Sequence, residues 1–567
     1  MLLTSGCGDD AKLVREIQSK RQQRQQSRTQ QDHLGEIFAL LRNFVDLDAE
    51  RARKQIAFHL NRWKEGKSVE AGAPAIVRSL RDVIPTDALE PRIEDPDFQP
   101  SDSQHLRDCF LFRSIYSWVD KESQDDALLT DWFASVQDEL GEEGTLQLQT
   151  ATRLFDWTVR SIALEPAVRV TPAPAGPKFP LGMTFRGAGY RQSDFETVVR
   201  GTGDGLQRAG VFTQLCRQAG IPAAVLATID STTGKTTPFC VGVRIGKDIY
   251  LFEPTLGVFV PGPDQVGIAT LAQARTNPLV LRRLGIAGLD QFKYTVTKDD
   301  VQQCAALLNL LPESISPRMK LLQSGLTGDR RMSVYTDADQ VAEQFDEVTG
   351  ISSVRLWDVP VLAEVYRATC NAHAERDPAF AFWYFARWAM MDADSGMAKN
   401  LKLGRWRHLI GQFADDEDEG TDGARTLYLA QRAPEFEIED LRIDPDLQKA
   451  YGIRRELGMD SRIYDQQVQQ VQAMMRLGKR TATYWLSLLQ ADDDRQETAE
   501  SWIRKRVLDD QQMSYWVPAA RYNMARLAER LGDAERAIEI YKEPSPQEHG
   551  NRIRARLVTK QLSAKAD

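Results

Sequence analysis

The chain has 567 residues, of which 42% are hydrophobic, and it carries a formal net charge of −9. This length predicts several domains rather than one core, and no apolar run approaches the roughly 18 residues of a membrane-spanning helix. The acidic charge, without a basic stripe interleaved with aromatic residues, argues against nucleic acid as a partner.

The cysteines are scattered along the chain and form no Cys-x-x-Cys pair. They are Cys7, Cys109, Cys216, Cys240, Cys304 and Cys370. The five after Cys7 lie in apolar segments, which favours buried free thiols over a disulfide framework or a metal site. We therefore expect no metal and no cofactor.

Residues 1–31 are expected to form an N-terminal segment outside the folded domains. Small residues precede Cys7, and a glutamine-rich stretch with six basic residues follows at 11–31, which is typical of a tether. The start resembles the end of a bacterial lipoprotein signal, although the charged and apolar regions of such a signal do not precede it here. The resemblance implies lipidation of Cys7 and an extracytoplasmic location at the cell envelope if translation starts upstream, and otherwise a cytoplasmic one.

Residues 32–143 are expected to form a helical domain. Apolar residues recur at helical spacing from Leu34 to Val45 and again from Ile56 to Trp63. Asp102 or Ser103 can cap a third helix. A proline-rich acidic loop from Pro91 to Pro100 is expected to separate this helix from the second group.

Residues 144–265 are expected to form an α+β core around the stretch from Arg200 to Asp230. A loop with glycines at 201, 203 and 205 leads into a helix, which Gly220 and Pro222 end. Residues 223–229 then predict a buried strand. Two further β-rich runs at 239–245 and 249–252 are joined by a Gly-Lys-Asp turn as a hairpin.

This core resembles the transglutaminase-like branch of the papain-related cysteine enzymes. The family pattern is Gly-Asp-Cys, an alanine four residues later, an apolar helix and then Gly-Ile-Pro-Ala. A preceding helix carries Ala, an aromatic-Asp-Trp step and Ile. The matching residues are Gly203-Asp204, Ala209, Gly220-Ile221-Pro222-Ala223, Ala151, Phe155-Asp156-Trp157 and Ile162. The resemblance implies a papain-like α+β fold.

The catalytic positions of that family are not matched. Gly205 stands at the position of the cysteine, Pro238 (or Phe239, one register over) at that of the histidine, and Glu253 at that of the aspartate. A cysteine nucleophile also needs a nearby imidazole to hold it as thiolate, and no histidine lies between His105 and His373. We therefore expect a vestigial triad without thiol chemistry.

Other chemistries stay open in this region. Cys240 begins a strand and is an alternative nucleophile, whereas Cys216 is expected to pack in the core. The carboxylates of Asp204 and Glu253 are an alternative acid–base pair, although Asp204 is expected to cap the helix that follows it. The glycine-rich loop could hold an anion at that helix, but it lacks the full spacing of a phosphate-binding motif.

Residues 266–355 are expected to form an α+β extension packed on the core. Short helices are predicted at 268–274 and 278–284. Strands are predicted at 292–297 and 331–335, where apolar and polar residues alternate.

Residues 356–567 are expected to form helical repeats. The stretch from Arg521 to Pro544 resembles a tetratricopeptide repeat, with Ala525, Gly532 and Ala537 at small positions, and weaker copies lie at 484–508 and 406–434. Such repeats stack helix pairs into a solenoid with a concave binding surface. The acidic run at 415–419 is expected in the turn between the helices of the first copy.

These patterns together predict a multidomain α+β protein with a helical N-terminal domain, a transglutaminase-like core and a C-terminal α-solenoid of tetratricopeptide-like helix pairs. The resemblances imply a catalytically inactive scaffold at the cell envelope that binds a protein or peptide through its C-terminal repeats and reaches the membrane only by its lipid anchor. The alternative is a hydrolase or acyl-transferase that reuses the cleft with Cys240, or with Asp204 and Glu253.

Overall fold

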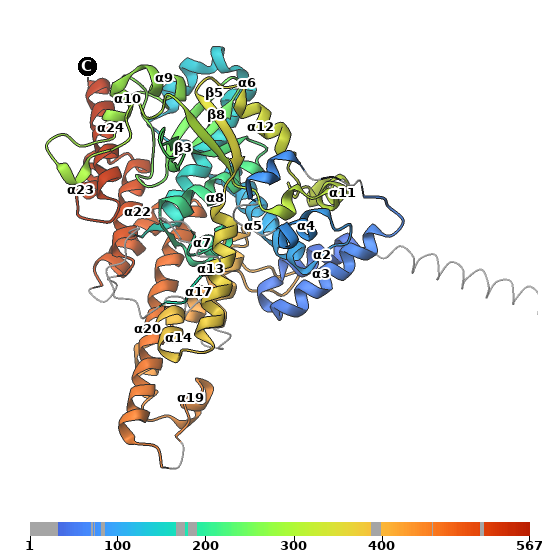
Figure 1. Cartoon of the computed structure of the whole chain (residues 1–567). Helices are drawn as coiled ribbons and strands as arrows, with labels where there is room; N and C mark the ends of the chain where they lie inside the picture. Colours follow the sequence, from blue (N-terminus) through green and yellow to red (C-terminus); the bar gives the residue numbers. More distant parts are fainter. Residues whose placement is uncertain are drawn as a thin grey trace, which may run out of the picture.

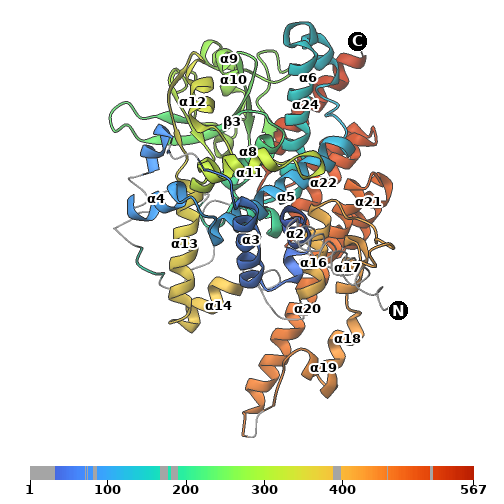
Figure 2. The same cartoon turned by 90° about the vertical axis from the view of Figure 1, so that its right-hand side faces the viewer.

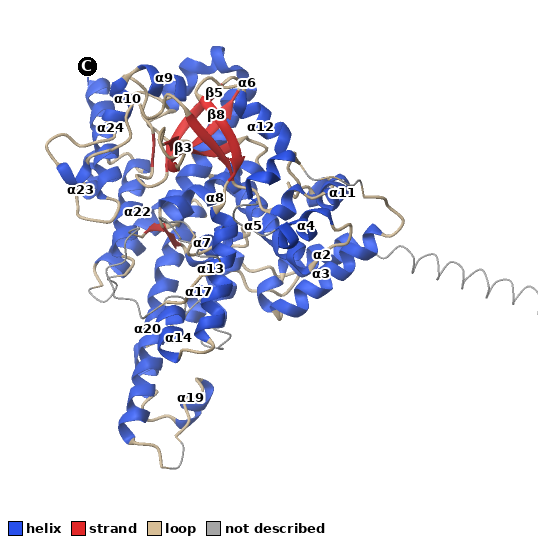
Figure 3. Ribbon diagram, in the orientation of Figure 1, coloured by secondary structure: helices blue, strands red, loops and turns tan. Residues whose placement is uncertain are grey.

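The protein is a mixed α+β structure in which helices surround one larger sheet (Figure 3). The computed structural model describes residues 32–69, 72, 74–80, 86–165, 176–179, 190–386, 398–455, 458–510 and 515–566. The predicted lipidation residue Cys7 and the tether after it lie outside these residues. None of the described helices is long and apolar enough to cross a membrane.

The N-terminal region is helical, as predicted, and its first two helices bury the predicted apolar faces. Asp32 and Asp48 cap these two helices by accepting backbone N–H groups of their first turns. The helices of this region are α2 (His33–Arg42), α3 (Ala49–Lys64), α4 (Thr86–Glu94), α5 (Pro100–Glu122) and α6 (Thr130–Ser161).

The boundary between α4 and α5 differs from the prediction. Helix α4 includes Pro91, inside the stretch expected to be a loop, because burial of Leu89 and Ile93 offsets the hydrogen bond that a proline cannot donate. Helix α5 begins at Pro100, so Asp102 lies within its first turn and not at the cap. The Asp102 carboxylate is fully buried, and Arg318 donates to it at 2.8 Å.

The main sheet has six strands in the order β6-β5-β4-β3-β7-β8. All neighbours are antiparallel except β7 and β8, which are parallel. The predicted strand at 223–229 and the predicted hairpin are both present, with Val241 of β4 paired to Val225 of β3 and Phe252 of β5. The strands are β3 (Ala223–Ile229), β4 (Thr236–Ile245), β5 (Asp248–Glu253), β6 (Val258–Phe259), β7 (Cys304–Leu308) and β8 (Ile351–Leu356).

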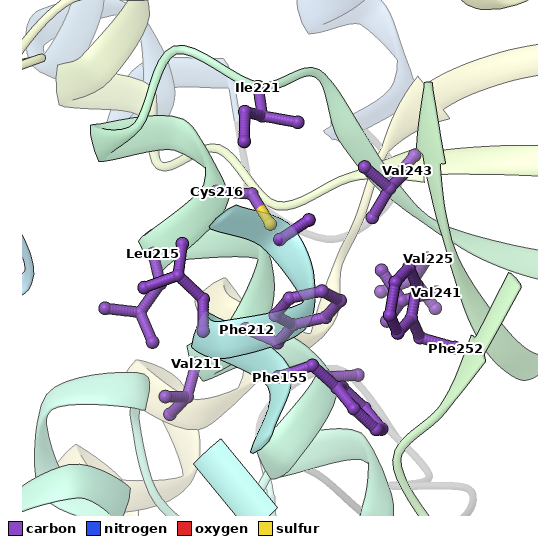
Figure 4. Packing of buried hydrophobic residues seen from close by; sticks show 14 of the residues in the cluster. Phe155, Val211, Phe212, Leu215, Cys216, Ile221, Val225, Val241, Val243 and Phe252 are labelled. Atoms are coloured by element: carbon purple, nitrogen blue, oxygen red, sulfur yellow. The ribbon is translucent and has the colours of Figure 1, made fainter. Parts of the chain in front are cut away.

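Helix α8 (Gly205–Gln218) packs against one face of this sheet (Figure 4). The Phe212 ring lies 5.1 Å from that of Phe155 on α6 and 5.2 Å from that of Phe252 on β5, so three elements meet at one aromatic cluster. Gly220, with φ of +71°, follows the helix end as predicted. The preceding helix α7 (Asp194–Arg200) and a small parallel ribbon of β1 (Ala163–Leu164) and β2 (Thr202–Gly203) complete this layer.

The extension contains the predicted short helices but not the predicted strands. Residues 293–297 and 331–337 are irregular. Alternating apolar and polar residues show that one side of a segment is buried, but a β-strand also needs a neighbouring strand to pair with. The sheet instead gains β7 and β8, which the sequence reasoning missed; the five residues of β7 are all apolar and all buried. The helices here are α9 (Leu271–Thr276), α10 (Pro278–Arg282), α11 (Pro317–Gly325) and α12 (Ala338–Asp346).

The C-terminal region is helical, and paired helices occur where the repeats were predicted. Helices α16 and α17, α20 and α21, and α22 and α23 pack in pairs. The acidic run at 415–419 lies in the turn between α16 and α17, as expected. The helices are α13 (Val359–Ala374), α14 (Pro378–Ala386), α16 (Lys399–Leu409), α17 (Ala424–Gln431), α18 (Glu435–Asp440), α19 (Pro445–Ala450), α20 (Ser461–Asp492), α21 (Gln496–Trp502), α22 (Val517–Arg530), α23 (Ala534–Tyr541) and α24 (Glu548–Ala566).

The last helices share a core with the rest of the molecule. One cluster of buried hydrophobic residues extends from Leu34 to Leu557 and includes residues of α22, α23 and α24. Buried ion pairs reinforce this contact: Arg526 of α22 lies 2.7 Å from Asp156 of α6, the aspartate of the Phe-Asp-Trp step. Helix α22 therefore packs directly on α6.

One part of the C-terminal region projects away from the body. We call α18, α19 and the first half of α20 the arm; both views show it extending from one end of the molecule (Figures 1 and 2). The arm has its own small cluster of buried residues, which includes Ile438, Leu441 and Val468. Its contacts are thus largely internal.

Candidate functional site

Gly205 begins α8, and local sequence explains why the helix starts there. The Asp204 side chain accepts the N–H groups of Leu206 and Gln207, both at 3.0 Å. The Gln207 side chain in turn accepts the Asp204 N–H at 2.9 Å, which completes a capping box. Asp204 is therefore the helix cap, as the sequence indicated.

The missing side chain of Gly205 is required by its neighbour. A Cβ atom built on Gly205 would lie 2.8 Å from Thr255 Cβ and 2.9 Å from Thr255 Cα, well inside normal contact distance. Thr255 comes two residues after Glu253, so the turn that ends β5 lies directly on the first turn of α8. Of the three glycines in the predicted loop, only Gly201 uses a positive φ, at the end of α7.

Cys240 and Glu253 lie on the sheet face opposite α8. Val241 and Phe252 point toward α8 (Figure 4), and side chains alternate along a strand, so their neighbours Cys240 and Glu253 point the other way. Pro238 pairs with Ala227, beyond an irregularity in the pairing of β3 with β4. The structure thus separates Cys240 from Asp204 by the thickness of the sheet.

Glu253 is a buried carboxyl group that accepts local backbone hydrogen bonds. The Thr255 N–H donates to its Oε1 at 3.0 Å. Burial raises the pKa of Glu253 to about 7, against the lowering effect of these bonds. Burial also raises the pKa of Cys240, and the neighbouring Glu253 adds to that effect. A thiol with a raised pKa beside a carboxylate is a poor nucleophile.

Arg208 connects the start of α8 to the C-terminal region. Its guanidinium is buried and donates to the carbonyl of Ile162 at 3.0 Å and to Gln547 Oε1 at 2.9 Å. Burial lowers the pKa of Arg208 to about 10. A cavity of about 170 Å³ remains beside it, between β1 and α22. The segment before α24 therefore covers Arg208, near the start of α8.

Helix α24 itself also approaches this region closely. A Cβ atom on Gly550 would overlap the carbonyl group of Leu256, in the turn after Glu253. Gly550 thus allows the backbone of α24 to contact that turn. This contact was not predicted from the sequence. More than 290 residues separate the turn at 256–257 from Gly550, and no local pattern links them.

A larger cavity of about 730 Å³ lies on another side of α8. It is bordered by α5, by one face of α8, by the segment after β7 and by α13. Arg92 closes part of its wall by pairing with Glu313 at 2.7 Å and with Glu364 at 2.9 Å. None of the residues singled out as a catalytic candidate lines this cavity.

Two residues of α5 place a thiol and an imidazole at the cavity. His105 Nε2 lies 2.8 Å from the carbonyl oxygen of Val334 and 3.5 Å from Cys109 Sγ. Arg217 of α8 donates to the same sulfur at 3.1 Å. Their i, i+4 spacing on one helix was visible in the sequence, but Cys109 was expected to be a buried free thiol and was not linked to His105.

The environment of this pair does not create a thiolate. Burial lowers the pKa of His105 to about 4 and raises that of Cys109 to about 11, so both side chains are neutral near pH 7. An activated cysteine needs the opposite shift of its pKa. The pair therefore forms part of the wall of the cavity and is not an activated dyad.

The geometry offers two regions of interest: a covered region around Gly205 and an open polar cavity between α5, α8 and α13. Comparison of the chain with protein-family models, with curated proteins and with solved structures finds no match.

Proposed function

We propose that this chain is a binding protein with a transglutaminase-like core that has no acyl-transfer chemistry. In this proposal it acts as a protein- or peptide-binding scaffold, with the C-terminal helices as the binding region. The lipid anchor at Cys7 and the location at the cell envelope belong to the same proposal. The observation that carries it is the packing of Thr255 against Gly205, which leaves no room for a nucleophile at the start of α8.

The surroundings of Gly205 support the absence of catalysis. A thiolate–imidazolium pair needs both members within hydrogen-bond reach, and Pro238 can accept no proton. Cys240 is 3% exposed and faces the other side of the sheet. Gln547 covers the neighbouring Arg208, so substrate access from that side is restricted.

The arm supports a role in binding. Three of its large apolar side chains are exposed: Phe436 by 69%, Ile443 by 78% and Ile463 by 52%. Helix α18 has four carboxylates among its six residues; Glu435 and Glu439 pair with Arg476 of α20, whereas Glu437 and Asp440 form no ion pair among the described residues. Exposed apolar groups beside acidic ones favour a partner that combines basic and apolar residues.

Activity assays on the purified protein test this proposal. Amine incorporation into a glutamine peptide and peptide cleavage are measured for the wild type beside a Cys240→Ser variant. We expect no turnover above the rate without protein in either sample. Turnover that the Cys240→Ser substitution abolishes would identify Cys240 as a working nucleophile and would overturn the proposal.

A further inference from the structure

Two side chains of opposite charge face the 730 Å³ cavity without an ionic partner. They are Asp194, in the first turn of α7, and Arg217, near the end of α8. The other acidic side chains that line it pair with arginines: Asp108 with Arg107, and Glu313 and Glu364 with Arg92. Asp194 is therefore the one acidic side chain lining the cavity that forms no ion pair among the described residues, and Arg217 is unpaired beside it; Arg53, which also lines the cavity, donates to the carbonyl of Ala49.

Asp194 is held against α8 by neutral groups. Asn309 Nδ2 donates to its Oδ2 at 2.9 Å, and no arginine or lysine of the described chain forms an ion pair with it. A Cβ atom on Gly210 would lie 2.9 Å from Asp194 Cγ, so Gly210 makes space for this carboxylate. Burial raises the pKa of Asp194 to about 6, which leaves it mainly ionised at pH 7.5.

Arg217 has only neutral partners. It donates to Gln214 Oε1 at 3.3 Å, to Cys109 Sγ at 3.1 Å and to the carbonyl of Ser333 at 3.0 Å. Its buried Nε has no hydrogen-bond partner in the described part of the chain. A half-buried guanidinium without a carboxylate can accept an anionic ligand group.

Asn309 adds a further unsatisfied acceptor beside Asp194. The side chain is 5% exposed, and its Nδ2 is fully used by Asp194, by the Gly210 carbonyl and by Thr213 Oγ1. Its Oδ1 is buried and has no partner among the described residues. Buried acceptors of this kind are normally hydrogen-bonded, so a missing donor is expected here.

We propose that this cavity binds a small molecule carrying both a primary ammonium group and a carboxylate, namely a free amino acid or a short peptide. The ammonium group donates to the Asp194 carboxylate, and the ligand carboxylate accepts from Arg217. An ammonium has three donors and no acceptor, which suits a site built from acceptors alone. The volume of 730 Å³ lies within the usual range for small-molecule sites.

The site is distinct from the region around Gly205, and the proposal does not depend on the absence of catalysis there. Asp194 and Arg217 lie on different elements, and Gln214 of α8 hydrogen-bonds to both side chains. The spacing of the two charged groups is therefore fixed by the fold. This spacing determines whether the site accepts an amino acid, whose two charges lie close together, or a peptide, whose charges lie further apart.

Calorimetric titration of the full chain at pH 7.5 tests the proposal. The probes are alanine and trialanine, with their N-acetylated and C-amidated forms as controls. We expect alanine or trialanine to bind, and either blocked form to bind at least about tenfold more weakly, because each loses one charged hydrogen bond. Tighter binding of alanine identifies an amino-acid site, and tighter binding of trialanine a peptide site.

Two variants connect the binding to the named residues. Asp194→Asn is expected to weaken binding of the probe with a free amine and to reduce its difference in affinity from the N-acetylated form. Arg217→Gln is expected to weaken binding of the probe with a free carboxylate and to reduce its difference in affinity from the C-amidated form. Asp230→Asn and Arg244→Gln, which change the same residue types outside the cavity, should leave the affinities unchanged.

The comparison of ligands within one variant keeps the test independent of small losses in stability. Absence of binding by both free probes to the wild type would overturn the proposal. So would equal affinity for the free and N-acetylated forms, or an Asp194→Asn variant that retains the full preference of the wild type for the free amine.

Discussion

At the residue scale, Gly205 is closely packed against Thr255. The residue begins α8 in the position that the transglutaminase-like resemblance assigns to a nucleophile, and Thr255 occupies the space where a side chain would be. A substitution that adds the side chain must therefore move the turn after β5. The packing of Thr255, and not Gly205 alone, therefore excludes a side chain at this position.

Gly205→Cys tests this packing. We expect the free energy of unfolding to fall by about 1–3 kcal/mol, the usual effect of overpacking, and no amine incorporation to appear. The measurement is chemical denaturation followed by circular dichroism. Gly176→Cys is the control, because a Cβ atom there would meet no other atom within 4 Å. An unchanged stability of Gly205→Cys would contradict the close contact with Thr255.

Glu253→Gln tests the buried carboxyl group. Its pKa is about 7 in the folded protein and ordinarily 4.5, so the folded state retains the proton between these values. The contribution of Glu253 to stability therefore decreases as pH rises from 4.5 to 7.

Because glutamine does not titrate, the stability of Glu253→Gln relative to wild type should increase over that range of pH. The pKa difference corresponds to at most roughly 3 kcal/mol. Denaturation midpoints of both proteins at pH 5 and pH 8 measure it. A difference between the two proteins that is the same at both pH values would show that Glu253 ionises normally.

At the scale of elements, α6 provides a charged contact between the core and helix α22 of the C-terminal region. Asp156 accepts from Arg526 at 2.7 Å and from Arg530 at 3.0 Å on α22, and from Arg160 on its own helix at 2.9 Å. These neighbouring guanidinium groups lower the pKa of Asp156 despite its burial. The Phe-Asp-Trp step of the sequence thus serves helix docking.

Asp156→Asn is expected to lower the free energy of unfolding by about 3–5 kcal/mol, because it leaves buried arginines without their counter-charge. Glu50→Gln removes an exposed pair with Lys54 and should change stability by less than about 1 kcal/mol. Thermal unfolding of both variants measures the contrast. Similar midpoints for the two would show that α22 does not depend on Asp156.

Local patterns predicted the elements whose signals are complete within a few residues. The strand at 223–229 follows a Gly-Ile-Pro helix stop, and the β4–β5 hairpin has its own turn residues. Strand β7 was missed because its five residues are uniformly buried, which gives no alternation to detect. The strand expected at 292–297 has the alternation but no neighbour to pair with.

For the whole molecule, the candidate sites that depend on adjacent residues were predicted, whereas those that depend on distant residues were not. Asp204 as a helix cap and Gly205 at the helix start followed from adjacent residues. The large cavity is lined by residues of α5, α8 and α13, and the positions of these helices relative to one another depend on the complete fold. Asp194, Arg217 and Asn309 carry no common motif, so sequence reasoning did not select them.

The arm gives a prediction about binding at this scale. Phe436→Ser combined with Ile443→Ser should leave the thermal midpoint unchanged, since both side chains are exposed. In native cells, the same double variant should no longer label the partner that the wild type labels in a proximity-labelling experiment. Leu531→Ser, another exposed apolar residue outside the arm, is the control. Retention of the same cross-linked partner by the arm variant would exclude the arm as the binding surface.

We propose that no thiol of the described chain is activated for acyl transfer. The direct test is the rate of alkylation by iodoacetamide at pH 7 for each cysteine, followed by peptide mapping of the folded and the unfolded protein. We expect the five described cysteines to react only after unfolding, because all are buried: Cys109, Cys216, Cys240, Cys304 and Cys370. If one of these cysteines reacts faster in the folded protein than in the unfolded chain, it is an activated nucleophile, and the proposal that the core has no thiol chemistry is wrong.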